Sequence, residues 1–265
     1  MKDRADIVLY KEGYVESIRL AQSYIMQGLV FTDERKILKA GEAIDYNSTI
    51  RIKGKKHPFV SRGGLKLNKA VEDFGLDLKD KTAIDIGAST GGFTDCMLQK
   101  GAGKVFAIDV GYGQLDWKLQ QDSRVVVMDR TNIRDVALED IGGQVDFISA
   151  DVSFISLKII LPIINELLRE DGASIILIKP QFEARKEDVG QGGVIRDSRV
   201  HQDVLERMFL EIGENKLGPV DLTFSPITGA QGNIEFLALL RKNQENNQAL
   251  DIASIVDQAH ENFSQ

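Results

Sequence analysis

A glycine-rich turn between an apolar stretch and an expected helix carries the clearest chemical signal in this chain. Residues 82–86 form a short β-branched apolar run that predicts a buried strand, and the turn from Gly87 to Gly92 follows it. A strand, a tight glycine turn and a helix N-terminus let a ligand approach bare backbone. Asp85 precedes the turn and would attract an ammonium group but repel a pyrophosphate. The pattern therefore favours a cationic ligand such as S-adenosylmethionine, with a plain strand–turn–helix connection as the alternative.

The turn also lacks the residues of a phosphate-binding loop. A phosphate-binding loop needs Gly-Lys-Ser/Thr at the helix start, and this turn has none. Asp109, expected at the end of the second strand, suits the two ribose hydroxyls of S-adenosylmethionine because a carboxylate accepts two hydrogen bonds. The predicted cofactor-binding residues are Asp85, Gly87, Ala88, Ser89, Gly91, Gly92, Phe93, Asp109 and Asp151.

The residues at the end of the fourth expected strand argue against two classes of methyltransferase. Residues 151–154, Asp-Val-Ser-Phe, stand where amino-methylating enzymes typically carry Asn/Asp-Pro-Pro-Tyr/Phe to hold an exocyclic amine. A cytosine C5-methyltransferase needs a cysteine nucleophile near the fourth or fifth strand, but Cys96, the single cysteine, falls in the first expected helix of this unit. The candidates that remain at the cleft are two lysines and two acids, Lys66, Asp151, Lys179 and Glu235.

The elements that must position these residues alternate between strand and helix from residue 81 onward. Strands are expected over 82–86, 104–109, 124–128, 145–151 and 173–179, followed by an antiparallel pair over 220–224 and 234–240. Helices are expected over 65–74, 156–169, 198–213 and 249–263. Such alternation predicts an α/β fold with a mostly parallel sheet covered on both faces. Ligands of these sheets bind beyond the carboxyl ends of the strands, where the candidate acids and Lys179 fall.

Composition sets the broad class of the protein. The chain has 265 residues, of which 43% are hydrophobic and 28% charged, as is ordinary for a soluble globular protein. A single cysteine excludes an internal disulfide and a Cys-rich zinc site, and no metal-ligand spacing is present. No secretory signal is visible, and no apolar run reaches the roughly 20 residues that a membrane span needs. We expect a cytoplasmic protein without a membrane or metal partner.

Residues 1–55 predict a separate small α+β unit, here called the N-terminal module. Two short helices come first, with Ser17 as N-cap and Gly28 as C-cap of the second. Strands near residues 29–31, from 37, and over 41–44 and 49–52 are expected to form one small sheet. Residues 1–66 hold 13 Lys/Arg and 8 Asp/Glu, a net charge of +5, so the remainder carries −12 of the overall −7. A basic end on an acidic body is typical of a nucleic-acid partner, but it fits a solvated basic surface without a partner equally well.

The spacing Asp-x-x-Leu-x-x-x-Gly-x-x-x-Ser that begins at Asp6 resembles the S-four-type RNA-binding domain. The resemblance implies binding of structured RNA through a basic helix face. Ile18 departs from the common Ser-Arg pair, and the arginine follows at Arg19. Residues 56–64 form a basic linker in which Pro58 favours extended backbone, and 65–265 form the second domain. The predicted RNA-binding residues are Arg4, Lys11, Arg19, Lys53, Lys55, Lys56, Arg62, Arg185 and Arg196.

Five longer motifs resemble the TlyA/haemolysin A family, and the resemblance covers almost the whole chain. They are Gly-Ala-Ser-Thr-Gly-Gly-Phe (87–93), Asp-Val-Gly-Tyr-Gly-Gln-Leu (109–115), Asp-Val-Ser-Phe-Ile-Ser-Leu (151–157), Lys-Pro-Gln-Phe-Glu (179–183) and Gly-Asn-Ile-Glu-Phe (232–236). The resemblance implies an FtsJ-like, Rossmann-like class I methyltransferase domain with a seven-stranded sheet. It also implies 2′-O-methylation of cytidine in ribosomal RNA from S-adenosylmethionine. The family's Lys-Asp-Lys-Glu tetrad matches Lys66, Asp151, Lys179 and Glu235.

This tetrad suits attack by a ribose hydroxyl. The 2′-hydroxyl is a poor nucleophile and must lose its proton as it attacks the methyl group. A lysine accepts that proton only when it is partly neutral; a second ammonium and desolvation lower its pKa, whereas carboxylates raise it and fix its geometry. We expect Lys179 as base, Lys66 as second cation, and Asp151 and Glu235 as orienting acids. The alternative is a structural ion-pair network that bridges strand ends.

Other interpretations stay open at this point. The loop over 183–197, with Arg185 and Arg196, is predicted either to close over RNA or to be a mobile surface loop. A cytolysin, which the second family name records, is disfavoured because no signal, membrane span or basic amphipathic helix is visible. An RNA-binding protein without catalysis is disfavoured by the intact tetrad. The sequence does not identify the target nucleotide, the ribosomal subunit or the oligomeric state.

Overall fold

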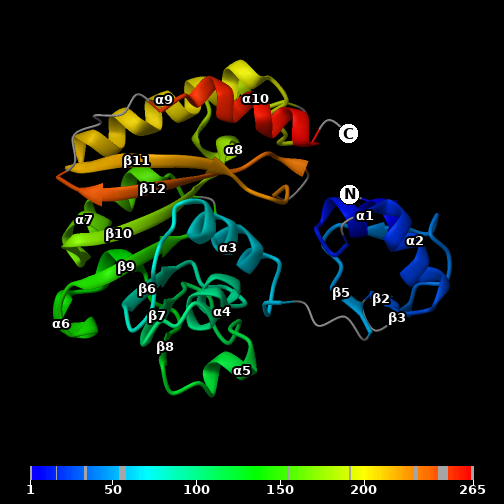
Figure 1. Ribbon diagram of the computed structural model, residues 1–265, viewed down its shortest axis with the longest axis horizontal. Coiled ribbons are helices and arrows are strands. Elements are labelled where there is room, and N and C mark those ends of the chain that lie inside the picture. The colour runs from blue at the N-terminus through cyan, green and yellow to red at the C-terminus, as the bar shows by residue number, and fades with distance from the viewer. Residues whose placement is uncertain are drawn as a thin grey trace.

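The computed structural model of the protein describes residues 2–15, 17–32, 35–53, 58–153, 155–190, 192–229, 232–243 and 250–263. Figure 1 shows a small N-terminal unit beside a larger α/β body, and the helix that ends the described chain reaches back toward the small unit. Two of the predicted RNA-binding residues, Lys55 and Lys56, lie outside the described residues.

The N-terminal module has a hydrophobic core of its own. Its elements are β1 (Lys2–Arg4), α1 (Ala5–Lys11), α2 (Ile18–Met26), β2 (Val30–Thr32), β3 (Arg35–Lys36), β4 (Ala43–Asp45) and β5 (Ile50–Ile52). Val8 and Leu9 from α1 pack with Ile25 from α2 and Val30 from β2. Ser17 caps α2, as predicted, because its Oγ accepts a hydrogen bond from the Leu20 amide at 3.2 Å.

The prediction of one small sheet in this module is wrong. Strand β4 pairs with β1, whereas β3, β2 and β5 form a separate antiparallel sheet. Strand β1 was not predicted, since its sequence, Lys2-Asp3-Arg4, is fully charged and has no β-branched residue. It becomes a strand because Lys2 and Arg4 align with Asp45 and Ala43 of β4.

The larger body begins with α3 and ends with α10. Its helices are α3 (Gly63–Asp73), α4 (Gly92–Gln99), α5 (Trp117–Gln120), α6 (Leu138–Ile141), α7 (Leu161–Leu167), α8 (Pro180–Glu183), α9 (Ser198–Glu214) and α10 (Ile252–Phe263), with short 3₁₀ turns η1 (Ile133–Asp135), η2 (Leu157–Ile159) and η3 (Lys186–Asp188). Its strands are β6 (Thr82–Ile86), β7 (Lys104–Ile108), β8 (Val125–Met128), β9 (Val145–Ala150), β10 (Leu168–Ile178), β11 (Leu217–Phe224) and β12 (Phe236–Lys242). Within the described ranges, no helix is both long and apolar enough to span a membrane.

These strands form one sheet whose mostly parallel arrangement was predicted correctly. In the described part of the chain it has seven strands in the order β11-β12-β10-β9-β6-β7-β8. Strands β10, β9, β6, β7 and β8 run parallel to one another, and the pairs β10–β12 and β11–β12 are antiparallel. The α/β fold class and the antiparallel final pair are therefore confirmed.

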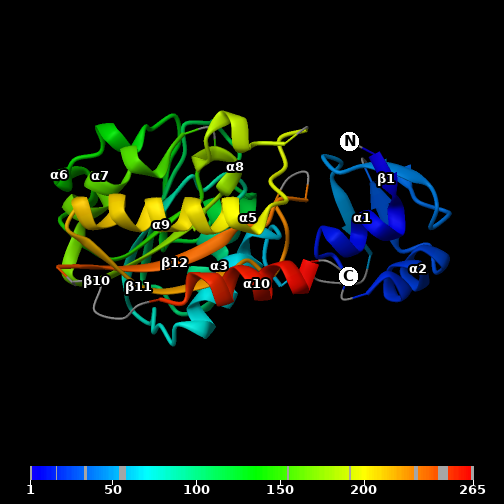
Figure 2. The same cartoon turned by 90° about the horizontal axis from the view of Figure 1, so that it is seen from above.

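Helices cover both faces of the sheet because the strands are apolar on both sides. Along β6, Ala83 joins the core under α3 and α4, whereas Ile84 joins the core under α7, α9 and α10. In β10, Ile175 and Ile176 divide between the two cores in the same way. Figure 2 shows α9 and α10 side by side along one face.

The segment between the fourth and fifth strands differs from the prediction of one helix over 156–169. Residues 157–159 form the turn η2, α7 begins at Leu161 with Pro162 in its first turn, and β10 already begins at Leu168. Leu168 is drawn into the sheet because it aligns with Val145 of β9. A sheet partner at that position overrides the helical periodicity of the sequence.

The packing of α3 against α4 depends on Gly92. A Cβ atom there would lie 2.8 Å from the backbone nitrogen of Gly64 and would collide with Oγ of Ser61. Because backbone cannot rotate aside, Gly92→Ala is expected to lower the free energy of unfolding by about 1–3 kcal/mol, measured by urea denaturation. The control is Gly213→Ala in α9, where a Cβ would meet open space and helix propensity favours alanine. Equal stability of the Gly92 variant and wild type would contradict this packing.

Candidate active site

The glycine turn after β6 is built from backbone that favours glycine. Gly87, Ser89 and Gly91 all have positive φ, at 81°, 47° and 94°. A Cβ on Gly87 would collide with the carbonyl oxygen of Asp151, so glycine lets the end of β6 lie against the end of β9. The amides of Gly87 and Ala88 both donate to the Ile108 carbonyl, at 2.9 and 3.1 Å. The turn is therefore fixed between its two neighbouring strand ends.

The Asp109 side chain connects the turn after β6 with the turn after β7. Its Oδ2 accepts a hydrogen bond from the Ser89 amide at 2.8 Å, and its Oδ1 accepts one from the Gly111 amide at 2.7 Å. An ionised carboxylate has about four lone-pair sites, so two amides leave room for two further donors. The arrangement fits the predicted role of Asp109 toward a vicinal diol.

Asp85 lies inside the sheet edge, with no exposed surface. Its Oδ2 accepts from Oγ1 of Thr94 at 2.7 Å and its Oδ1 from Oγ of Ser149 at 2.9 Å. Burial raises the pKa of Asp85 to about 6, the Asp151 carboxylate adds to the rise, and the two hydroxyls oppose it. The carboxylate is thus ionised at neutral pH, and the two side chains that donate hydrogen bonds to it, Thr94 and Ser149, are uncharged. Its predicted contact with an ammonium group stays a prediction.

The structure brings the four tetrad residues together as two ion pairs. Lys66 Nζ, from α3, lies 2.5 Å from Oε2 of Glu235, which directly precedes β12. Lys179 Nζ, directly after β10, lies 2.6 Å from Oδ1 of Asp151, directly after β9, and donates to Oγ of Ser153 at 2.9 Å. The side chains of Lys66, Glu235 and Lys179 are 8%, 3% and 10% exposed. Asp151 is the most open member, at 23%.

Electrostatics couple the two pairs. Burial works to lower the pKa of Lys66, but Glu235 and Asp151 outweigh it and the pKa is raised. Burial works to raise the pKa of Asp151, but Lys66 and Lys179 outweigh it and the pKa is lowered. Lys66 is therefore a fixed cation and Asp151 a fixed anion at neutral pH, which suits the roles of second cation and orienting acid.

Two residues that support the site were not among the predicted ones. Ser153 receives the hydrogen bond from Lys179 described above. Glu183 accepts from Oγ of Ser156 and from the Leu157 amide, both at 2.8 Å, and so holds the chain that follows β9 against α8. Both lie in motifs visible in the sequence, two residues after Asp151 and four after Lys179. Their short distance in sequence from Asp151 and Lys179 is the signal that could have identified Ser153 and Glu183 as supporting residues.

The predicted RNA-binding residues fall into three groups. Six of the described ones are exposed: Arg4, Lys11, Arg19, Lys53, Arg185 and Arg196. Two of these six form ion pairs inside the N-terminal module: Arg4 with Asp6 at 2.8 Å and Lys11 with Asp3 at 3.6 Å. Arg62 pairs with Glu12 of the module, and its side chain is 27% exposed. Arg62 thus belongs to the contact between the two units.

The chain is similar to known methyltransferases along almost its whole length. Residues 59–242 match the family model of the FtsJ-like methyltransferase. YqxC of Bacillus subtilis, named as a candidate rRNA methyltransferase, is 46% identical over 100% of this chain and 96% of its own length. The 16S/23S rRNA (cytidine-2′-O)-methyltransferase TlyA of Mycobacterium tuberculosis is 38% identical over 99% and 97%. A solved structure from Streptococcus thermophilus, named as a hemolysin candidate, has a TM-score of 0.82 and 45% identity over 99% and 97%.

Proposed function

The chain belongs to the TlyA/haemolysin A family of FtsJ-like methyltransferases, and from that premise we propose that it methylates the 2′-hydroxyl of a cytidine in ribosomal RNA. The observation that carries this proposal is the coupled arrangement of the buried pairs Lys66–Glu235 and Lys179–Asp151 at the carboxyl edge of the sheet. Two cations and two acids beside a glycine turn suit deprotonation of a hydroxyl next to a bound methyl donor.

The residues present fit S-adenosylmethionine as the methyl donor. The glycine turn keeps side chains away from the strand ends, and Asp109 retains acceptor capacity for the ribose hydroxyls. Asp85 is buried behind the turn, so it would act on the amino group through its negative charge. Bound there, the cofactor supplies an electrophilic methyl group on its sulfonium. Asp85, Asp109 and the 87–93 turn would hold it.

Lys179 is the base of the proposed mechanism. Asp151 and Ser153 fix its Nζ in one orientation, so the nitrogen is held at one place to receive the proton of the 2′-hydroxyl. Lys66, kept charged by Glu235 and Asp151, places a second ammonium in the same network. Asp151 interacts with both lysines, which makes it the residue that orders the pair.

RNA binding is assigned to the N-terminal module in this proposal. We divide the chain into the module at 1–55, the linker at 56–64 and the methyltransferase domain at 65–265. The family match covers residues 59–242, so it begins after the module and within the proposed linker. Exposed Arg19 and Lys53 on the module, and exposed Arg185 and Arg196 on the loop after β10, are the proposed contacts to phosphate.

Transfer of labelled methyl groups tests the proposed function. The protein is incubated with S-adenosylmethionine labelled on the methyl group and with small- and large-subunit ribosomal RNA, free and in subunits. Label in ribosomal RNA from either subunit is expected. Failure to label any of these substrates by a protein that binds the cofactor would contradict the proposal.

Binding of the cofactor should depend on pH through Asp85. Because burial raises the pKa of this carboxyl to about 6, the anion that attracts the amino group disappears as the pH falls below about 6. The affinity for S-adenosylmethionine is expected to fall by up to about tenfold per pH unit there. Isothermal titration between pH 7.5 and 5 measures this, with Asp85→Asn as the control that flattens the profile. The same pH profile in both proteins would contradict the contact.

A further inference from the structure

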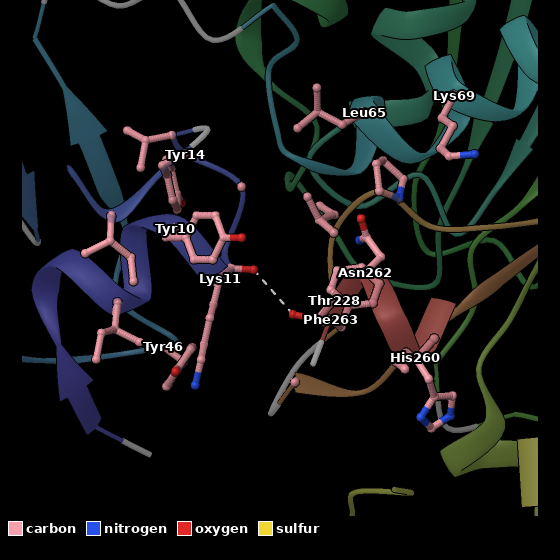
Figure 3. Close-up of a pocket in the computed structure, with 18 of the residues that line it drawn as sticks. Tyr10, Lys11, Tyr14, Tyr46, Leu65, Lys69, Thr228, His260, Asn262 and Phe263 are labelled. Atoms are coloured by element: carbon pink, nitrogen blue, oxygen red, sulfur yellow. Dashed lines mark hydrogen bonds between the residues drawn. The ribbon is translucent and has the colours of Figure 1, made fainter. Parts of the chain in front are cut away.

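Three successive residues at the end of α1 connect the N-terminal module to the larger body. The Lys11 carbonyl accepts a hydrogen bond from Oγ1 of Thr228 at 3.3 Å (Figure 3), and the Glu12 carboxylate pairs with Arg62. Gly13, with φ of 71°, comes so close to Ile227 that a Cβ would lie 2.5 Å from Cγ2 of that residue. We call residues 11–13 the connecting turn.

Beside the connecting turn, the two units line a cavity. Its volume is about 1210 Å³, and its walls include Tyr10 and Tyr46 from the module and Lys69 and Phe263 from the body. Figure 3 shows these side chains on opposite sides of the space, bridged by the Lys11–Thr228 hydrogen bond. The connecting turn is therefore a localised contact at the edge of a cavity.

The connecting turn touches both segments that supply the Lys66–Glu235 pair. Arg62 directly precedes α3, and Lys66 follows one helical turn later. Thr228 lies in the loop that folds over Glu235: the Ser225 amide donates to the Glu235 carbonyl at 2.8 Å, and the Gly229 amide donates to the Asn233 carbonyl at 2.8 Å. A shift of the module against the body would thus act on both partners of one tetrad pair.

Charge links Glu12 to the tetrad. The Glu12 side chain is only 4% exposed, and among the described residues its Oε1 has no hydrogen-bond partner, so Arg62 is the group that compensates this buried anion. Burial lowers the pKa of Arg62, whereas Glu235 and Asp151 act to raise it, so the guanidinium is within electrostatic reach of both tetrad acids. With Glu12 present, three cations face three carboxylates; the cations are Arg62, Lys66 and Lys179, and the carboxylates are Glu12, Asp151 and Glu235.

We propose that Glu12 and Arg62 are positioning residues for the methyl transfer: Glu12 holds the Arg62 guanidinium away from Glu235 and so preserves the Lys66–Glu235 pair. This rests on the proposed function. Without the Glu12 charge, the carboxylates of Glu235 and Asp151, the partners of Lys66 and Lys179, still attract Arg62. Arg62 then competes with the lysines for these acids, and the order of the tetrad is lost. The N-terminal module contributes to turnover in this way as well as to RNA binding.

The variant Glu12→Gln tests the proposal in the full chain. We expect kcat to fall by about tenfold or more, while KM for RNA and the Kd for S-adenosylmethionine stay within about twofold of wild type. Glu12→Asp keeps the charge and is expected to recover part of kcat. The matched control is Glu42→Gln, which removes the ion pair of the module with Arg35, and its kcat should equal that of wild type.

A double variant separates positioning from a merely structural role. In Glu12→Gln/Arg62→Gln the competing guanidinium is gone, so kcat is expected to rise above that of Glu12→Gln alone. A structural interface would lose stability and activity further with the second change. Wild-type kcat in Glu12→Gln, or a double variant slower than the single one, would overturn the inference. If wild type itself transfers no methyl to ribosomal RNA, the proposed function fails, and that outcome is seen before any variant is compared.

Discussion

Replacing Lys179 with alanine is expected to lower kcat for methyl transfer by about 10²- to 10⁴-fold, the range that removal of a general base produces. Lys179 Nζ is held by Asp151 at 2.6 Å and by Ser153 at 2.9 Å, so alanine removes the group that we propose as the base for the hydroxyl. The glycine turn and Asp109 do not involve Lys179, so the Kd for S-adenosylmethionine should stay within about threefold. Single-turnover kinetics with excess enzyme measures the chemical step directly.

A control for this variant is available on the same side of the sheet. Lys158→Ala removes a lysine whose side chain is 53% exposed and whose ion pair is with Glu211 of α9. It should leave both the methyl transfer rate and cofactor binding within about twofold. Undiminished turnover in Lys179→Ala would show that Lys179 is not the base. Equal losses of methyl transfer rate in Lys179→Ala and Lys158→Ala would point to a general effect of lysine removal.

Breaking the Lys66–Glu235 pair should have the largest effect on stability as well as an effect on activity. Glu235→Gln leaves the Lys66 ammonium buried with its closest carboxylate gone, and removal of one partner of a buried ion pair typically costs about 3–5 kcal/mol. The Asp151 charge, which also acts on Lys66, places the expected loss at the lower end of this range. Urea denaturation measures the stability, and methyl transfer should fall at least tenfold under conditions where the variant is folded.

A double replacement distinguishes stability from chemistry at this pair. Lys66→Met/Glu235→Leu exchanges two buried charges for apolar groups of similar size, a change that is often neutral or stabilising. It is expected to recover most of the stability lost in Glu235→Gln without recovering methyl transfer, because the second cation is absent. Recovery of methyl transfer together with stability would show that the pair is structural only.

The sequence predicted the larger body well because its elements are marked locally. The run 82–86 is apolar and ends at glycine, and the acids and lysine that follow the strands fall at one edge because parallel strands align their carboxyl ends. Register confirms this alignment, since Ile86 lies opposite Ile108 and Ala150. The four tetrad residues were therefore placed together correctly from motif and topology.

Features that depend on distant partners were missed. The charged strand β1 exists only through its pairing with β4, and β10 extends back to Leu168 only through Val145 of β9. Asp85 was expected beside the turn, but Thr94 and Ser149 hold it inside the sheet edge. In each case the deciding partner is not a neighbour in sequence.

The contact between the two units was missed for the same reason. Arg62 was predicted to bind RNA because it follows a basic stretch. Its pairing with Glu12, fifty positions earlier, depends on the folded N-terminal module lying against the body. Glu12 is a single charged residue at the end of a helix, and nothing in the sequence around it indicates which distant residue it pairs with. The positioning role proposed for this pair therefore comes from the three-dimensional arrangement alone.

The position of the transferred methyl group tests the central claim most directly. Ribosomal RNA methylated by the protein is digested to nucleosides and analysed by mass spectrometry, which separates a methyl on the ribose from a methyl on the base. The account predicts 2′-O-methylcytidine, absent when Lys179→Ala replaces wild type. Methyl groups on a base nitrogen or carbon would contradict it, because a lysine base held by Asp151 and Ser153 was assigned to deprotonate a ribose hydroxyl.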